Sequence, residues 1–166
     1  MRKENNEFDK IISSYISHPK VMELKDYAHH GINRYEHSYR VAYHTYKLTK
    51  FFKLNYVSAT KAALLHDFFL DEVLNEKAWD RFKKHPDVAV SNAKKYFSLN
   101  DLEEDIIKCH MFPITFTIPK YIESWLVDFI DDYISVYERI FSISYSVKDY
   151  LSYIFIIFIS IFRTKL

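Results

Sequence analysis

The chain has 166 residues, with 23 basic and 22 acidic side chains and a formal charge of +1 at pH 7. A single domain over residues 1–166 is expected, and a chain of this size buries enough surface to fold without disulfides or a structural metal. The balanced charge argues against a nucleic-acid polymer as partner. A single cysteine, Cys109, and an N-terminal decapeptide without an apolar stretch indicate a cytoplasmic protein.

The glycine and proline content points to an all-α fold. The chain contains one glycine, Gly31, and only four prolines. Sheet proteins use glycine-rich turns at their hairpins, so this composition disfavours a sheet. Aromatic residues make up 18% of the chain and supply a large apolar core.

Apolar residues at helical spacing, interrupted by proline, glycine and capping residues, predict a series of helices. In chain order, these helices cover residues 5–17, 20–27, 34–53, 58–67, a stretch that opens at His85, 100–110, 122–140 and 147–163. The segment 58–67 is rich in small and apolar residues and is expected to be the central buried helix. A linker of about 15 residues follows it, and Pro86 is expected in the first turn of the next helix.

The C-terminal segment is unusually apolar. Between Ile140 and Phe162 only Lys148 and Asp149 are charged, and residues 150–162 carry no charge. A helix of 13 residues spans about 20 Å, which is shorter than the roughly 30 Å of a bilayer core, so no membrane span is expected. We interpret 147–163 as a final core helix, with a homodimer interface or a membrane-surface contact as open alternatives.

Histidines and aspartates are the residues that can carry chemistry. The dipeptide His66-Asp67 ends the predicted buried helix, where an ionisable pair is costly unless it is hydrogen-bonded or coordinates a metal. The alternative is a hydrogen-bonded core histidine beside an exposed aspartate. His37, His85, His110 and a late aspartate also fall at helix ends or on inward faces.

With these residues in this order, the chain resembles the HD-domain phosphohydrolases, and in particular the small single-domain HD proteins of low-GC Gram-positive bacteria. The resemblance covers residues 20–140 and rests on five stretches. They are Tyr35-Glu-His-Ser-Tyr-Arg-Val-Ala, Ala63-Leu-Leu-His-Asp-Phe-Phe, His85-Pro-Asp-Val-Ala-Val-Ser-Asn-Ala, Asp105-Ile-Ile-Lys-Cys-His and Leu126-Val-Asp-Phe-Ile-Asp-Asp-Tyr. The resemblance implies a single-domain helical bundle with a central metal site that hydrolyses a phosphate ester.

Helix geometry selects one of three candidates for the late aspartate. At 100° per residue, Asp131 falls within the apolar arc that Val127 and Ile134 define. Asp128 and Asp132 fall roughly 100° away, on a flank where solvated charges are expected. The alignment pattern of the family points to Asp131 as well.

The resemblance also implies a ligand set. The first ion would be held by His37, His66, Asp67 and Asp131, and Asp67 would bridge to a second ion held by His85 and His110. Imidazole and carboxylate donors suit Mn, Fe, Ni or Zn, with Mg possible. Two ions roughly 3.5 to 4 Å apart would activate a hydroxide for attack on phosphorus, with Asp67 and His66 as catalytic residues. Glu138 is either an acceptor for a ligating imidazole or a surface charge.

Substrate contacts are less defined. Arg40, His30, Lys84 and Lys120 lie near the motifs and are candidate phosphate contacts, although most such side chains are solvated surface charges. The expected substrate is a small phosphorylated molecule, a nucleotide or dinucleotide. The Phe68-Phe69-Leu70 continuation departs from the HD-GYP signature of cyclic-dinucleotide phosphodiesterases, whereas the six-ligand set is similar to that of HD-type diadenosine tetraphosphate hydrolases. The alternative function is a non-catalytic HD-fold nucleotide- or metal-binding sensor or interaction module.

Overall fold

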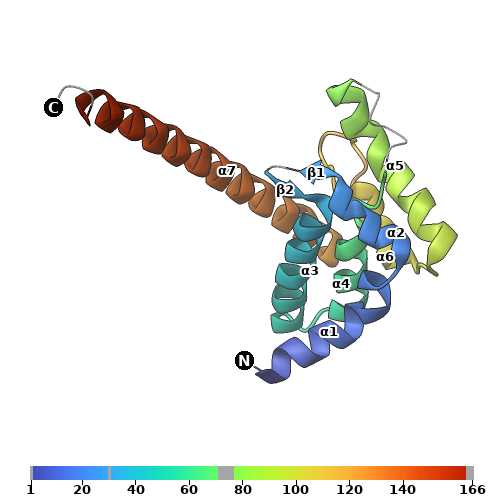
Figure 1. Cartoon of the computed structure of the whole chain (residues 1–166). Coiled ribbons are helices and arrows are strands. Elements are labelled where there is room, and N and C mark those ends of the chain that lie inside the picture. The colour runs from blue at the N-terminus through green and yellow to red at the C-terminus, as the bar shows by residue number, and fades with distance from the viewer. Residues whose placement is uncertain (1, 30, 71–76, 164–166) are drawn as a thin grey trace.

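The computed structural model describes residues 2–29, 31–70 and 77–163, and side chains within 7–27, 31–70, 77 and 79–143. Its described elements are α1 (Arg2–Ile16), α2 (Pro19–Met22), the 3₁₀ helix η1 (Glu23–Asp26), β1 (Ala28–His29), β2 (Ile32–Asn33), α3 (Arg34–Phe51), α4 (Tyr56–Leu65), α5 (Ala78–Tyr96), α6 (Asp101–Cys109) and α7 (Ile122–Arg163). The all-α prediction is confirmed, because the strands form a single antiparallel pair of two residues each (Figure 1).

Helix α4 is the centre of the bundle. It packs against α1, α3, α6 and α7, and most of its residues are buried. The side chain of Asn55 caps its first turn by accepting a hydrogen bond from the backbone N–H of Ser58. The small side chains of Ala59, Ala62 and Ala63 allow the neighbouring helices to approach closely. The predicted buried helix is therefore present, and it delivers His66 at its C-terminal end.

The β1–β2 hairpin contains the single glycine of the chain. Gly31 has a φ of +92°, a backbone conformation that side chains with a Cβ rarely adopt. A Cβ built at this position would also overlap the side chain of Ser142 on α7. Glycine is thus required both by the turn and by the close approach of the hairpin to α7.

Helix α5 begins earlier than predicted. It starts at Ala78, so the expectation that Pro86 lies in its first turn is wrong, and the linker is shorter than expected. Pro86 has no N–H to donate to the carbonyl of Phe82, so one backbone hydrogen bond of α5 is missing. The helix nevertheless begins eight residues before Pro86 and continues through it. Part of the expected linker, residues 71–76, lies outside the described residues.

Helix α7 ends later than predicted. It runs for 42 residues without interruption, so the predicted end at residue 140 and a separate helix over 147–163 are wrong. The sequence has no glycine or proline between Ile122 and Arg163, and nothing therefore terminates the helix. Its first half packs on α3, α4 and α6, and Figure 1 shows the remainder extending away from the other helices. In the part of the chain that the structure describes, no helix has the length and apolarity to cross a membrane.

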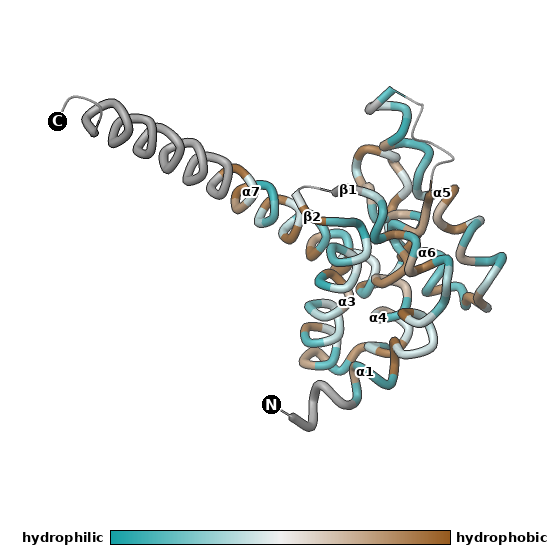
Figure 2. Tube along the Cα trace, viewed as in Figure 1, coloured by the Kyte–Doolittle hydropathy of each residue, from teal (hydrophilic) through white to brown (hydrophobic). Residues whose placement is uncertain are grey.

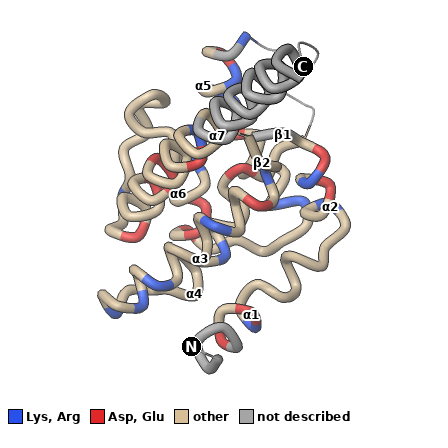
Figure 3. The backbone as a smooth tube through the Cα atoms, turned by 60° about the vertical axis from the view of Figure 1, so that its left-hand side comes forward, with Lys and Arg blue, Asp and Glu red and all other residues tan. Residues whose placement is uncertain are grey.

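Charge is distributed rather than gathered on one element. Basic and acidic residues both occur on α1, α3, α5 and α6 (Figure 3). The first turn of α6 is acidic and is closed by a capping box between Asn100 and Glu103. This box fixes the start of the helix that ends at His110.

Candidate metal centre

The predicted ligand candidates converge in the core. Two buried groups of side chains each present ligand atoms within 4.8 Å of one another. The first group is His37, His66 and Asp67, and the second is Asp67, His85 and His110. Asp67 belongs to both groups. Because each histidine comes from a different element, the centre ties together α3, the end of α4, α5 and the end of α6.

Helix α7 completes the first group. The Nε2 atom of His37 lies 2.8 Å from Oδ1 of Asp131, and its Nδ1 atom lies 2.8 Å from Oε2 of Glu138. Both carboxylates are buried. Asp131 is therefore at the centre, where the helix-face prediction put it. Glu138 contacts a candidate ligand imidazole rather than lying at the surface, and Arg40 donates a hydrogen bond to its other oxygen at 3.2 Å.

The other three imidazoles are oriented by backbone carbonyls. Their Nδ1 atoms donate to Ala63 O at 2.8 Å for His66, to Arg81 O at 3.0 Å for His85, and to Ile107 O at 2.7 Å for His110. Because a carbonyl can only accept, each Nδ1 must carry a proton, and each Nε2 is the ring nitrogen that can bind a second proton or a cation. These Nε2 atoms point toward Asp67: His66 lies 3.9 Å from Oδ2, while His85 and His110 lie 3.3 and 3.5 Å from Oδ1.

Two features of this arrangement fit bound cations. Nε2 of His66 is buried and makes no hydrogen bond within the described residues, although it lies 3.4 Å from Oδ1 of Asp131. Nε2 of His85 lies 2.8 Å from Nε2 of His110, which is too close for two lone pairs or two protons to face each other. Such an arrangement requires a shared proton or a cation. Imidazole and carboxylate donors without thiolate suit divalent Mn, Fe, Ni, Zn or Mg.

The buried carboxylates are held in their ionised form. Burial raises the pKa of Asp67, but the charge of His66 and hydrogen bonds from His110 and His85 lower it well below its ordinary value. The pKa of Asp131 is shifted in the same direction because His66 and His37 outweigh its burial. Burial lowers the pKa of His37, yet hydrogen bonds to Asp131 and Glu138 raise it to about 10. The ionised carboxylates are therefore balanced by protons on the imidazoles, and a cation that binds at the centre would displace those protons.

The four candidate substrate contacts are placed differently. The Arg40 side chain is 44% exposed and is joined to the centre through Glu138. Lys84 is exposed on α5, directly before His85. Lys120 is exposed in the segment before α7, and its backbone N–H donates to Asp105 at 3.0 Å. His30 lies outside the described residues.

Arg34 is a buried residue beside the centre that the sequence analysis missed. Only 4% of its surface is exposed, and its Nη1 atom donates to the carbonyl of Phe69 at 2.5 Å. Its guanidinium also stacks on the Phe69 ring at 3.7 Å, and that ring lies 4.9 Å from the ring of His85. The signal available in the sequence was its position three residues before His37, which places both on one helix face.

The predicted environment of Asp128 is wrong. Asp132 is exposed as expected, but only 8% of Asp128 is exposed, and its Oδ1 atom makes no hydrogen bond among the described residues. The flank that carries Asp128 is covered by α6 and the segment that follows it, from which Phe112 and Cys109 approach. Burial raises the pKa of Asp128 to about 7, with the charges of Asp132 and Asp131 acting in the same direction.

Comparison with known families gives a match that coincides with this centre. The family model described as the HD domain matches residues 34–135, which is more than half of the chain. Comparisons with curated proteins and with solved structures found no match. The matched range contains all six side chains predicted as metal ligands, from His37 to Asp131. The chain therefore belongs to the HD-domain family.

Proposed function

We propose that the protein is a cytoplasmic, metal-dependent phosphohydrolase that acts on a small phosphate ester, a nucleotide or dinucleotide. HD domains are generally metal-dependent hydrolases. The observation that carries the proposal is the shared Asp67, whose two oxygens face two separate groups of buried imidazoles. Such a donor set would hold two divalent ions, with Asp67 contributing to both.

Each predicted ligand has a role in this proposal. The first ion is assigned to His37, His66, Asp67 and Asp131, and the second to Asp67, His85 and His110. When bound, such ions lower the pKa of water and neutralise charge on phosphoryl oxygens. Asp67 lies beside the imidazoles of both groups. The hydrogen bond from Nδ1 of His66 to the carbonyl of Ala63 orients Nε2 of His66 toward the centre. Glu138 and the carbonyl acceptors fix the orientation of the imidazoles.

Substrate binding is assigned to basic side chains around the centre. Arg40 is partly exposed and contacts Glu138 through one nitrogen, which leaves other guanidinium N–H groups for phosphate oxygens. Lys84 adjoins the second group, and we assign Lys120 and His30 as further phosphate contacts. Substituting Arg40 by Gln should raise KM more than it lowers kcat, because it weakens binding without removing a metal ligand.

Metal content is the first test. Protein purified without chelators and loaded with Mn or Fe should contain about two ions per chain by elemental analysis. A content below roughly 0.2 ion per chain after loading would reject the proposed centre.

Activity is the second test. Mono- and dinucleotides, including diadenosine tetraphosphate, are screened for phosphate release or product formation with Mn, Fe, Ni, Zn or Mg. The matched control is Asp67→Ala, with folding verified by circular dichroism. Metal and nucleotide binding without turnover by the wild type would instead identify a non-catalytic sensor, which is the competing function.

A further inference from the structure

Helix α7 has a second apolar face in addition to the one that packs on the bundle. The inner face buries Val127, Ile130 and Ile134. On the outer face, six large apolar side chains are each between 58% and 66% exposed: Ile122, Phe129, Tyr133, Val136, Ile140 and Ile143. Figure 2 shows hydrophobic positions recurring along the described part of this helix. The packing of α7 on its own bundle leaves this second apolar face exposed, and an exposed apolar surface of this extent indicates contact with a partner.

The spacing of this outer face is that of a coiled coil. Including the half-buried Leu126, the positions are 122, 126, 129, 133, 136, 140 and 143, which alternate steps of four and three residues. The sequence continues the same steps at Val147, Tyr150, Ile154, Ile157 and Ile161. A repeat of 3.5 residues keeps one stripe facing another helix over many turns, whereas a lipid-facing surface has no need of it. We call this stripe, from Ile122 to Ile161, the seam.

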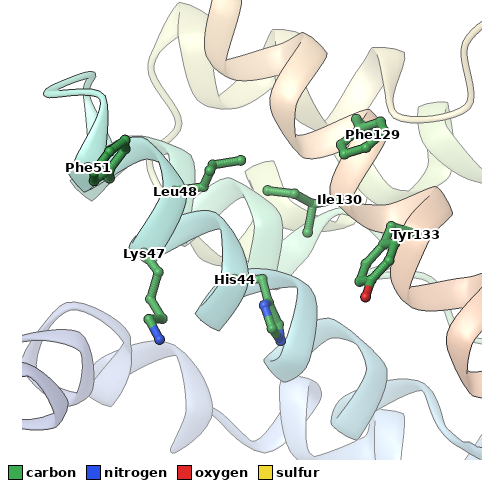
Figure 4. A pocket seen from close by; sticks show the side chains of 7 residues that line it. All are labelled: His44, Lys47, Leu48, Phe51, Phe129, Ile130 and Tyr133. Carbon is green, nitrogen blue, oxygen red and sulfur yellow. The ribbon is translucent and has the colours of Figure 1, made fainter. Parts of the chain in front are cut away.

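A second apolar wall lies beside the first half of the seam. A cavity of about 390 Å³ separates the end of α3 from α7. Figure 4 shows Phe51 and Leu48 of α3 on one side and Phe129 and Tyr133 of α7 on the other. Phe51 is 77% exposed. A helix lying on the seam would therefore also contact α3.

We propose that the seam pairs with the seam of a second copy of this chain, as an antiparallel coiled coil. Antiparallel pairing lays the projecting half of each α7 along the first half of the other, beside the cavity. Helix α7 is long enough for this, because 42 residues span about 63 Å. Residues 150–162 carry no charge, and a helical segment that is apolar on all sides is expected to be buried on several sides. In this pairing the segment would pack against both α7 and the end of α3 of the second copy.

This pairing has a defined register and sufficient area. When the two seams are aligned over their full length, Ile140 lies opposite Ile143 of the second copy, and Val136 lies opposite Val147. The six exposed seam side chains from each of two copies supply on the order of 1,000 Å², before the projecting halves are counted. Stable interfaces bury about 1,200 to 2,000 Å², so the complete seam is large enough.

Oligomeric state is the first test, measured on the full chain by size exclusion with light scattering. The wild type should have twice the 20.0 kDa mass of one chain. The double variant V136E/I140E should have the mass of one chain. The matched control is F116E/I118E, which adds the same charge to side chains that are 82% and 67% exposed but lie off the seam. It should stay a dimer. Circular dichroism and metal content verify that both variants are folded.

Orientation is the second test, and it uses disulfide formation between copies. The native Cys109 is buried and does not interfere. V136C mixed with V147C should crosslink under mild oxidation, whereas V136C alone should not. Crosslinking of V136C alone would show a parallel pair and overturn the proposed arrangement. A monomeric wild type would overturn the proposal. A monomer that also floats with phosphatidylcholine vesicles would identify a membrane surface as the partner instead.

Discussion

At the scale of single residues, Asp67 is the position on which both halves of the centre depend. We predict that Asp67→Ala lowers metal content and hydrolysis more than any single histidine substitution, because it removes a ligand that the two ions share. His85→Ala or His110→Ala should lower the stoichiometry from about two ions to one. Asp131→Ala should rank next after Asp67→Ala. Metal content is measured with each rate, because a lost ligand can act by emptying the site.

Asp128 provides the control for this ranking. It lies on the same helix as Asp131, but its buried Oδ1 atom has no hydrogen-bond partner among the described residues, whereas Oδ1 of Asp131 lies 2.8 Å from Nε2 of His37. Asp128→Ala should leave the hydrolysis rate close to that of the wild type. Equal losses of activity at Asp128 and Asp131, in folded proteins, would show that the last ligand is assigned to the wrong aspartate.

The raised pKa of Asp128 predicts a pH-dependent stability. A carboxyl with an ordinary pKa of 3.8 loses its proton in the unfolded chain, while folded Asp128 holds its proton to about pH 7. Between these values the folded state binds more protons, so this residue makes stability fall as pH rises. Asp128→Asn should remove the effect. Its gain in the free energy of unfolding over the wild type should be about 1 to 2 kcal/mol larger at pH 8 than at pH 5, after allowance for solvent screening. Urea unfolding at both pH values, with the same metal content, measures this. A gain that is equal at pH 5 and pH 8 would contradict it.

Arg34 is predicted to position the second half of the centre. Lysine keeps the charge but cannot both stack on Phe69 and donate to its carbonyl with a planar group. Arg34→Lys should therefore weaken binding of the second ion roughly 10-fold or more, because the Phe69 ring on which Arg34 stacks lies against the ring of His85. The first ion should stay bound. Metal titration followed by calorimetry separates the two ions. Equal weakening of both would indicate a general loss of packing instead.

The histidines and aspartates that converge in the centre could be predicted from the sequence, whereas the environments of Arg34 and Asp128 could not. His37, His66 and His110 are recognisable because an ionisable side chain on a buried face needs a specific partner. The environments of Arg34 and Asp128 depend on which segments cover them, namely Phe69 and the residues after α6. Helix periodicity gives the direction of a side chain but not what lies in that direction.

At the scale of elements, the helices that were predicted correctly have local start and stop signals. Helix α6 begins at a capping box, and α3 begins after Asn33, whose side chain accepts from the N–H of Glu36. The errors occurred where such a signal was assumed. Pro86 suggested a helix start, although α5 tolerates it in its interior. A break after residue 140 was assumed in α7, although the sequence there contains no glycine or proline to end a helix.

The hairpin gives a prediction at this scale. Gly31→Ala should destabilise the protein by about 1 to 2 kcal/mol, because alanine is strained at a positive φ and its Cβ overlaps Ser142. Adding Ser142→Gly should recover only part of this loss, since the overlap is relieved and the backbone strain remains. Denaturant unfolding of the single and double variants measures both contributions. Full recovery in the double variant would assign the entire effect to the contact with α7.

At the scale of the whole molecule, the centre links most of the bundle. Its candidate ligands come from α3, α5, α7 and the C-terminal ends of α4 and α6. Metal removal should therefore lower the stability of the domain as one cooperative unit. An ion present at 100 times its Kd contributes about 2.7 kcal/mol, which corresponds to a Tm shift of roughly 5 to 10 °C for a domain of this size. Calorimetry before and after chelation tests this. Asp67→Ala serves as control, because its Tm should not respond to chelator.

The seven-residue interval between Asp131 and Glu138 has a consequence for how this chain tolerates insertions and deletions. Both carboxylates lie within hydrogen-bonding distance of the His37 ring. They can both reach it because seven residues make nearly two full helical turns, so that Asp131 and Glu138 point in nearly the same direction from the helix axis. One added residue between them would swing Glu138 about 100° around the axis and away from the imidazole. The same addition beyond Ser142 would leave the centre intact and shift only the phase of the projecting half. In the first half of α7, insertions and deletions are therefore limited by the contacts of Asp131 and Glu138 with His37. In the second half they are limited only by the 3.5-residue repeat of the seam.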